Sequence, residues 1–369
     1  MKILHLITTT DLGGAEKQLL HLARSQIKHG YTVHVAYLKG SGTLNRDFES
    51  SGVRVHTELT SRCFFRQIFQ LNRILKQIRP DVMHGHLPRS EILVALIPST
   101  CPKIVSKHNS ETFIPQKGFG YVSRILSRTV ERRVSSIVCI SNSVLQFLVS
   151  VGEISDSNKY HIVHYGITQK KLRNTAQNVQ DLSYLKLGTI SRLSPQKDLK
   201  TQIEGFTSYA TEFQESTLSI LGVGPLEKIL KEYVQMFECG NRVNFLGQSK
   251  DIESFFKTID VFVLSSKYEG FGLVLLEAMN EGVPILSSNS IAAIEVLGDN
   301  FPGFFSIGNV TEFKEKLIEI HSLDFRRRLV NLQEERLSLF SIEITFEKMH
   351  QIYELSIEYF LQRNSRSSS

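Results

Sequence analysis

The chain has 369 residues, of which 41% are hydrophobic and 22% are charged, and its formal net charge is +6. This length allows two domains with a core each, and the composition is typical of globular enzymes rather than disordered chains. No apolar run approaches the roughly 18 residues of a membrane-spanning helix, and the first residues lack the cleavage site of a secretory signal. Four scattered cysteines without a C-x-x-C pair indicate reduced thiols and a cytoplasmic protein.

Charge is distributed unevenly along the chain. Residues 1–170 contain 22 Lys and Arg against 11 Asp and Glu, whereas the remaining residues contain 21 against 26. Much of the excess lies in two stretches with the pattern of basic amphipathic helices, 62–76 and 124–133. Such helices suit peripheral docking on an anionic membrane leaflet, and the alternative is a solvated helix face. No nucleic-acid-binding module accompanies the charge, so we expect no nucleic-acid partner.

The first half alternates buried strands with amphipathic helices. The first strand, 3–7, leads into a loop with Gly13 and Gly14 and then into a helix that reaches about His29. Backbone amides at such a helix start can bind a diphosphate. The loop lacks the G-x-G-x-x-G fingerprint of dinucleotide-binding proteins and the G-K-[ST] of a P-loop, so alone it is weak evidence for phosphate binding.

Histidines stand on or after two later strands. His84 and His86 share one face of a strand and could chelate a metal, but no third ligand is evident, so we interpret them as core or edge histidines and predict no metal site. His108 stands at the carboxyl end of the strand that begins at Lys103, where an open α/β sheet presents side chains to ligands. The alternative role for His108 is in a turn or a helix cap.

The second half repeats the alternation of strands and helices. Arg192 and Lys197 flank the turn after its first strand, where two cations could clamp a pyrophosphate. They could also be plain surface cations at a helix entry.

The stretch from Ser265 to Pro284 carries the densest set of candidate binding residues. A buried strand runs into Glu269 and the turn Gly270–Gly272, and Glu277 follows about one turn into the next helix. The first helix amides favour a phosphate or sugar oxygen, the glycines allow close approach, and a carboxylate suits the paired hydroxyls of a ribose. Alternatively, Glu277 is a solvated helix residue and Glu269 only stabilises the helix start.

The predicted organisation is a first Rossmann-like domain, a polar linker, a second Rossmann-like domain, a C-terminal helix that packs back across the domains, and a disordered tail. The predicted bounds are 1–167, 168–183, 184–340, 341–362 and 363–369.

These motifs together resemble a known family, the retaining nucleotide-sugar glycosyltransferases of family 4, over about residues 1–360. The resemblance rests on the order and spacing of Gly13-Gly14-Ala15-Glu16, Arg192 with Lys197, Gly222-Val223-Gly224-Pro225, and Glu269 with Glu277. It implies the GT-B architecture: two Rossmann-like domains with parallel sheets face across a cleft, the second holds most of the donor and the first most of the acceptor. After the strand that closes the first domain the family often has Asn-Gly-Ile/Val-Asp, where this chain has Tyr165-Gly166-Ile167-Thr168.

The resemblance also implies a role for each matched residue. Arg192 and Lys197 would bind the donor diphosphate and stabilise the leaving nucleotide, and the loop of Gly13 and Gly14 would close on it. Glu277 would hold the ribose hydroxyls.

The remaining matched residues would contact the transferred sugar. Glu269 would lie next to it, together with the amides of Phe271, Gly272 and Leu273, and His108 would face it at the reacting centre. The resemblance implies that neither a metal nor another cofactor is required, because cations and helix amides stabilise the departing phosphate. The donor phosphate would accept the proton of the acceptor in a same-face attack, and Glu269 as a covalent nucleophile is the less favoured alternative.

The sequence therefore predicts a retaining hexosyltransferase that moves a sugar from a nucleotide donor, UDP-linked, to a lipid-linked or envelope saccharide in polysaccharide biosynthesis. One alternative is a transferase that depends on GDP-mannose. The others are a nucleotide-sugar 2-epimerase and a non-catalytic scaffold on the same fold. We expect a cytoplasmic protein that docks on the cytoplasmic face of the membrane.

Overall fold

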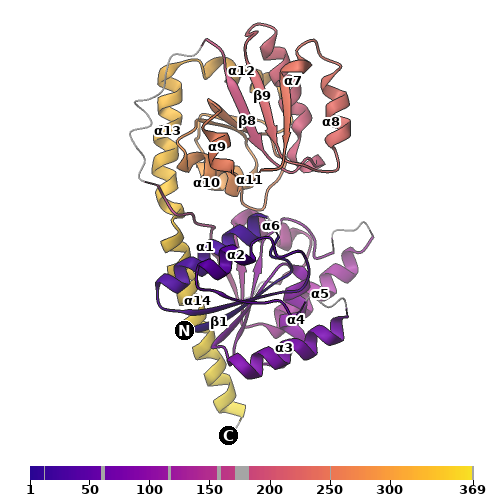
Figure 1. The fold of residues 1–369 in the computed structure, drawn as a ribbon, viewed down its shortest axis with the longest axis vertical. Coiled ribbons are helices and arrows are strands. Elements are labelled where there is room, and N and C mark those ends of the chain that lie inside the picture. The colour runs from indigo at the N-terminus through magenta and orange to yellow at the C-terminus, as the bar shows by residue number, and fades with distance from the viewer. Residues whose placement is uncertain are drawn as a thin grey trace. The chain divides into compact units, whose positions relative to one another are not determined.

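The computed structural model describes residues 1–11, 13–59, 63–114, 118–155, 159–170, 183–249 and 251–367. The chain divides into two compact units, Met1–Thr168 with Phe340–Ser369, and Gln169–Leu339 (Figure 1). The predicted linker falls largely on residues 171–182, which lie outside the described residues.

The first unit is built on a seven-stranded parallel sheet with the order β3-β2-β1-β4-β5-β6-β7. Every residue of the central strand β4 is buried, as expected for a parallel sheet with helices on both faces. The strands are β1 (Lys2–Ile7), β2 (Thr32–Tyr37), β3 (Arg54–His56), β4 (Val82–His86), β5 (Lys103–Lys107), β6 (Ser136–Cys139) and β7 (Tyr160–Ile162).

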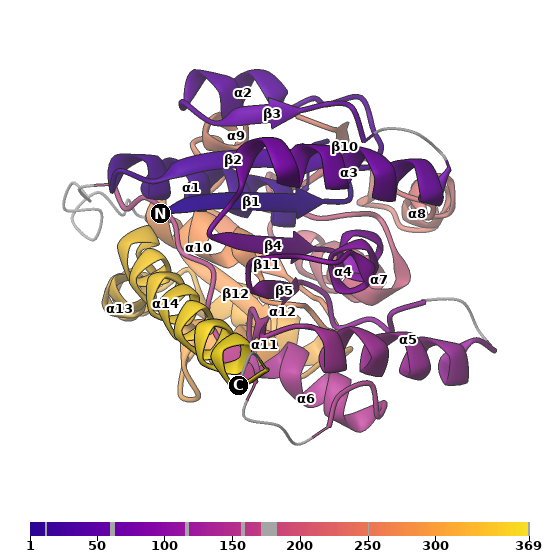
Figure 2. The same ribbon diagram turned by 90° about the horizontal axis from the view of Figure 1, so that it is seen from below.

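Helices cover this sheet on both faces. Helices α1 and α14 lie on one side of it, and α3, α4 and α5 lie on the other (Figure 2). The helices of the unit are α1 (Gly14–Lys28), α2 (Asn45–Ser50), α3 (Phe64–Ile78), α4 (Pro88–Leu96), α5 (Gly120–Arg133), α6 (Asn142–Ser150) and α14 (Ile342–Ser367).

The C-terminal helix α14 completes the core of the first unit. Its residues Met349, Ile352 and Tyr353 lie in one buried cluster with Ile3 of β1 and Leu22 of α1. Helix α14 continues to Ser367, into the segment 363–369 that was predicted as a disordered tail, and residues 368–369 lie outside the described residues. Extending a formed helix adds one backbone hydrogen bond per residue, so a polar end can continue the helix that a packed segment has nucleated.

The second unit is built on a six-stranded parallel sheet with the order β10-β9-β8-β11-β12-β13. Its strands are β8 (Lys186–Ile190), β9 (Thr217–Leu221), β10 (Val243–Gly247), β11 (Val261–Leu264), β12 (Ile285–Ser288) and β13 (Phe304–Phe305). Its helices are α7 (Leu199–Ala210), α8 (Glu227–Val234), α9 (Ile252–Phe256), α10 (Leu273–Asn280), α11 (Ile291–Leu297), α12 (Val310–Glu319) and α13 (Leu323–Leu337).

The strand order of both sheets reverses beside the first strand of the unit, which is β1 in one and β8 in the other. Open α/β sheets bind ligands at the carboxyl ends of their strands near such a reversal. The predicted architecture of two Rossmann-like, parallel-sheet domains of the GT-B fold is therefore confirmed, and it points to the loops after β1 and β8. No described helix is both long enough and apolar enough to cross a membrane.

Candidate active site

Two predicted site residues of the second unit meet at the carboxyl edge of its sheet. Lys197, after β8, forms an ion pair with Oε1 of Glu269, after β11, and the side chains are 13% and 9% exposed. Ser266 donates a hydrogen bond of 2.7 Å to the same carboxylate oxygen. Strands β8 and β11 are neighbours in the sheet, which brings residues 72 positions apart into contact. The pair offers an incoming ligand a cation and a hydrogen-bond acceptor side by side.

Backbone contacts hold the two loops of this pair together. The hydroxyl of Ser265 donates to the carbonyl of Lys197 at 2.8 Å, and the amide of Lys267 donates to the carbonyl of Gln196 at 2.8 Å. The Ser288 hydroxyl in turn donates to the Ser266 carbonyl at 2.6 Å. These contacts fix the loops before any ligand arrives, which is the preorganisation that a binding site requires.

Arg192 lies two residues after β8, and its side chain is exposed. The motif Gly222–Pro225 supports the loop that carries Arg192. The amide of Leu193 donates to the carbonyl of Val223 at 3.1 Å. A Cβ atom on Gly222 would lie 1.9 Å from the carbonyl oxygen of Ser191, so only glycine permits this close packing.

Helix α10 presents its amino end at the same edge. Its N-cap is Gly272, whose φ of 89° favours glycine, and a glycine has no side chain to cover the first amides. The preceding residue, Phe271, is buried, whereas the first helical residue, Leu273, is partly exposed. Glu277 is the fifth residue of the helix and is partly exposed, as the predicted contact with ribose hydroxyls requires.

The loop after β1 in the first unit contains the predicted glycines. Gly13 is the N-cap of α1 and Gly14 its first residue, and a Cβ on Gly14 would meet no atom within 4 Å, so a ligand has room at this helix start. Glu16, in the first helical turn, is only 7% exposed, and burial raises its pKa to about 7. Asp11 orders the loop by accepting hydrogen bonds of 3.0 and 2.7 Å from the amide and hydroxyl of Ser41.

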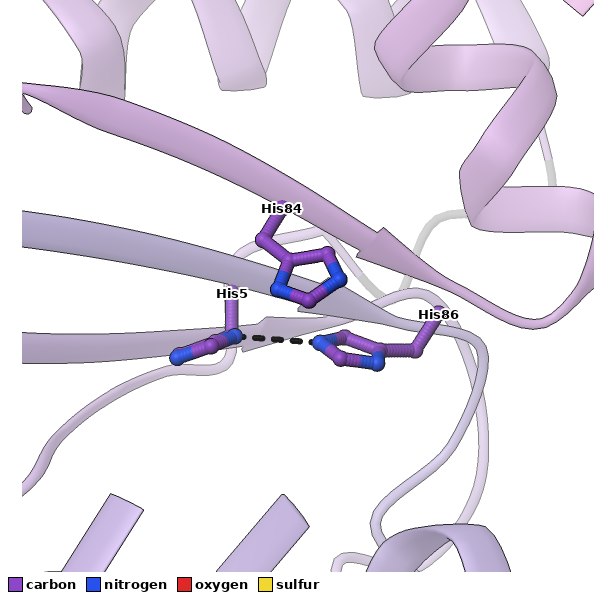
Figure 3. A group of neighbouring side chains, drawn as sticks. All are labelled: His5, His84 and His86. Carbon is purple, nitrogen blue, oxygen red and sulfur yellow. Dashed lines mark hydrogen bonds between the residues drawn. The ribbon is translucent and has the colours of Figure 1, made fainter. Parts of the chain in front are cut away.

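Three buried imidazoles lie together beneath the carboxyl edge of the first sheet (Figure 3). His5 joins His84 and His86, and one nitrogen from each lies within 4.8 Å of the others. The prediction that this pair lacks a third potential ligand is wrong. The parallel pairing of β1 with β4 places His5 opposite His84, and spacing along the sequence cannot reveal that contact.

Hydrogen bonds with protein groups already engage the nitrogens of this cluster. His84 contacts the Tyr353 hydroxyl at 2.9 Å and the Ser106 hydroxyl at 2.8 Å. His5 Nδ1 lies 3.0 Å from His86 Nε2. The three imidazoles could hold a metal ion only by giving up at least the bond between His5 and His86.

His108 also has protein partners at both ring nitrogens. Nε2 lies 3.1 Å from His86 Nδ1, and Nδ1 is hydrogen-bonded to the Tyr165 hydroxyl. Burial of the ring is the main cause that lowers the pKa of His108 to about 3, with a smaller contribution from the charge of Lys107. Near neutral pH His108 is therefore an uncharged group that is held from two sides.

A cavity of about 220 Å³ lies beside His108, and sequence reasoning missed the charged groups in its wall. Lys107 and Glu91 form a buried ion pair of 2.5 Å there. Glu153 is 1% exposed, its Oε1 accepts a 2.8 Å hydrogen bond from the Phe113 amide, and its Oε2 has no partner among the residues that the structure describes. An unsatisfied buried carboxylate oxygen favours a ligand that donates a hydrogen bond.

Two family models match the chain, and each covers most of one of the two units. The model described as "Glycosyltransferase Family 4" matches residues 12–170, and the model described as "Glycosyl transferases group 1" matches residues 171–336.

Two curated relatives are bacterial enzymes. The chain is 26% identical over 365 residues to an α-1,4-N-acetyl-D-galactosaminyltransferase of Campylobacter jejuni, named for a PP-undecaprenol-linked saccharide, and the match covers 93% of this chain and 95% of the relative. It is 26% identical over 292 residues to the UDP-Gal:α-D-GlcNAc-diphosphoundecaprenol α-1,3-galactosyltransferase of Escherichia coli, covering 72% and 75%.

Solved structures share the fold. HepE of Anabaena, in complex with UDP-glucose, aligns with a TM-score of 0.79 at 18% identity, over 96% of this chain and 99% of that one. TarM aligns with a TM-score of 0.79 at 11% identity, over 95% and 98%.

The raised pKa of Glu16 predicts how stability depends on pH. Because the folded-state value of about 7 lies above the unfolded value of 4.5, ionising Glu16 destabilises the folded state as the pH rises through this window. The substitution Glu16→Gln removes this penalty. We expect the variant to match the wild type near pH 4 and to gain up to about 3 kcal/mol in free energy of unfolding near pH 8, measured in urea. The exposed Glu49→Gln is the control, and a gain for Glu16→Gln that is equal at both pH values would contradict the assignment.

Proposed function

The chain belongs to the family 4, group 1 glycosyltransferases, and we propose that it transfers a sugar from a UDP-linked donor to a lipid-linked saccharide with retention of configuration. The observation that carries this proposal is the ion pair of Lys197 and Glu269 at the carboxyl edge of the second sheet. Arg192 follows the same strand as Lys197, and the start of α10 follows the same strand as Glu269.

The donor diphosphate binds Lys197 and Arg192 in this proposal. Lys197 is paired with Glu269 before the donor arrives, so the diphosphate competes with the carboxylate for the ammonium group. As the phosphate takes Lys197, Glu269 becomes available to accept hydrogen bonds from the hydroxyls of the sugar. The open amides of α10 complete the sugar site, and Glu277 binds the ribose hydroxyls. Lys197, Arg192 and the amides at the start of α10 supply the positive charge, so no metal is required in this proposal.

Transfer proceeds on one face of the donor sugar. The bond between the anomeric carbon and the diphosphate oxygen breaks, and its electron pair stays on the departing UDP. The acceptor hydroxyl forms the new bond to the anomeric carbon and gives its proton to the departing phosphate. Arg192 and Lys197 stabilise the negative charge that develops on that phosphate, which is the main catalytic contribution we assign to the protein. A covalent bond to Glu269 is the less favoured route.

The acceptor sugar occupies the cavity beside His108 in this proposal. Glu153 Oε2 needs a hydrogen-bond donor, and Phe113 offers an apolar ring, so the cavity matches a neutral sugar with one hydroxyl or amide against the carboxylate. Glu91 and Lys107 neutralise each other, so the carboxylate of Glu153 makes the wall of the cavity negative. A negative wall disfavours the pyrophosphate of a lipid carrier there. The saccharide therefore enters this cavity while the diphosphate and lipid stay outside.

The choice of UDP and of a lipid-linked acceptor draws on the relatives. The Escherichia coli enzyme is named for a UDP-linked donor, and both curated enzymes are named for saccharides on a diphosphate-linked undecaprenol. The capsular polysaccharide glycosyltransferase CapM of Staphylococcus aureus, 22% identical over 382 residues, supports a place in envelope polysaccharide biosynthesis. A GDP-linked donor, an epimerase and a scaffold remain the alternatives to test.

Exposed apolar residues support docking on a membrane. Phe65 and Phe69 on α3 are 80% and 72% exposed, and Tyr121 and Ile125 on α5 are 75% and 47% exposed. Each pair is spaced four residues apart, so its members share one helix face. Exposed apolar residues with flanking cations are typical of helices that lie in a lipid interface, where a lipid-linked acceptor is found.

The function is tested by the binding of UDP, GDP and their sugar derivatives to the full chain. We expect the UDP series to bind more tightly than the GDP series. Glu277→Ala should weaken binding about tenfold or more, because a charged acceptor for the ribose hydroxyls is lost. Glu281→Ala, which removes a carboxylate paired with Lys170, is the matched control and should bind as the wild type does. Preference for GDP would favour the mannose alternative, and no binding in either series would favour a scaffold.

Membrane docking is tested by cosedimentation with vesicles. The exposed cations of α3 that the structure describes include Arg66 and Arg73, whereas Arg62 lies outside the described residues. We expect Phe65→Ser with Phe69→Ser, and separately Arg66→Glu with Arg73→Glu, to lower binding to phosphatidylglycerol vesicles by at least about tenfold. The control is Met236→Ser, which removes an apolar side chain of the second unit that is 77% exposed. Unchanged binding of both double variants would refute docking through α3.

A further inference from the structure

A continuous line of hydrogen bonds joins helix α1 to His108. Gln26 Oε1 lies 2.9 Å from His5 Nε2, His5 Nδ1 lies 3.0 Å from His86 Nε2, and His86 Nδ1 lies 3.1 Å from His108 Nε2. Tyr165 ends the line with a hydrogen bond to His108 Nδ1. Gln26 and His5 are fully buried, and His86 is 3% exposed. No solvent competes for these partners, so each link constrains the next.

The imidazoles of this line are neutral near pH 7. Burial lowers the pKa of His5 to about 4 and that of His108 to about 3, and it lowers the pKa of His86 well below its usual value. A neutral imidazole has one nitrogen that donates and one that accepts. If one neighbour accepts a hydrogen bond from the ring, the ring must therefore accept a hydrogen bond from the other neighbour.

Gln26 sets the direction of these hydrogen bonds. Its Oε1 can only accept, so His5 donates from Nε2 and accepts at Nδ1. His86 must then donate from Nε2 to His5 and accept at Nδ1, and His108 must donate from Nε2 to His86. The Tyr165 hydroxyl consequently donates to His108 Nδ1.

Gln26 contacts Tyr353 through the other end of its amide. Gln26 Nε2 faces the Tyr353 hydroxyl at 3.4 Å, and that hydroxyl lies 2.9 Å from His84 Nδ1. The hydroxyl accepts from Gln26 and donates to His84, whose Nε2 then donates to Ser106 at 2.8 Å. With the Gln26 amide oriented as it is in the structure, this assignment gives every one of these groups a partner.

We propose that His5 and His86 are positioning residues that, anchored by Gln26, hold the ring of His108 in one tautomer and one orientation. The inference rests on the proposed place of His108 at the reacting centre. A ring held at both nitrogens cannot flip without breaking two hydrogen bonds, so the edge that it turns to the adjacent cavity stays constant. His108 then shapes the site as a neutral, fixed group and does not act as a general base.

His84 provides a matched control. It lies on β4 two residues from His86, it is fully buried, and it makes two side-chain hydrogen bonds. None of these bonds belongs to the line that reaches His108. Substituting His84 therefore disturbs packing and hydrogen bonding to a similar extent but removes no bond of the line that reaches His108.

The test combines nitrogen NMR of ¹⁵N-histidine-labelled full-length protein with kinetics of sugar transfer. We expect wild-type His108 to carry its proton on Nε2. In His86→Phe and in Gln26→Leu we expect a mixture of tautomers at His108 and a fall in kcat of at least about tenfold, with the donor KM unchanged within about twofold. Gln26→Glu keeps an acceptor at the start of the line and should retain the wild-type tautomer, as should His84→Phe.

Each other outcome has a defined meaning. If the His108 tautomer is unchanged in both His86→Phe and Gln26→Leu, or changes equally in His84→Phe, the inference is wrong. Stoichiometric Zn²⁺ that shifts the nitrogen signals of His5 and His86 would also overturn it, because a bound metal would replace their hydrogen bond. If the tautomer changes while kcat does not, the positioning stands and the proposed place of His108 at the reacting centre fails.

Discussion

The ion pair of Lys197 and Glu269 is the contact on which the second unit's site depends. It joins the loops after two neighbouring strands, and hydrogen bonds around Ser265 and Ser266 hold those loops in place. The side chains of the pair are 13% and 9% exposed, so the pair lies at the surface of the sheet edge and is not sealed in the core. The pair thus holds the cation and the carboxylate in position and leaves neither charge without a partner.

The candidate site of the first unit contains buried imidazoles that are neutral near pH 7. The sheet edge of this unit carries a line of hydrogen-bonded imidazoles that begins at one glutamine, next to a cavity with a carboxylate oxygen that lacks a partner among the described residues. Charges in the second unit suit a diphosphate, whereas the neutral, directional network in the first suits the hydroxyl groups of a saccharide. This division agrees with a donor bound mostly by one domain and an acceptor bound mostly by the other.

Local patterns in the sequence were sufficient for the architecture and for the sheet edge at which the candidate residues of the second unit lie. Apolar runs separated by helical periods predicted two parallel sheets, and the residues after each strand predicted the edge at which Arg192, Lys197 and Glu269 lie. The contact between His5 and His84 could not be predicted, because it depends on the pairing of β1 with β4 and not on spacing. The same holds for the partners of Glu153, which come from segments that only the packing of the first unit brings together.

The anomeric configuration of the product distinguishes transfer on one face of the donor sugar from transfer with inversion. The full chain is incubated with an α-linked UDP-sugar and a saccharide on a diphosphate-linked polyprenol, and the new linkage is determined by NMR. We expect an α-linkage that forms with the wild-type protein and is lost or strongly reduced in Lys197→Ala. A β-linkage would contradict the same-face mechanism. Transfer at the wild-type rate in Lys197→Ala would show that the ion pair is not the core of the donor site.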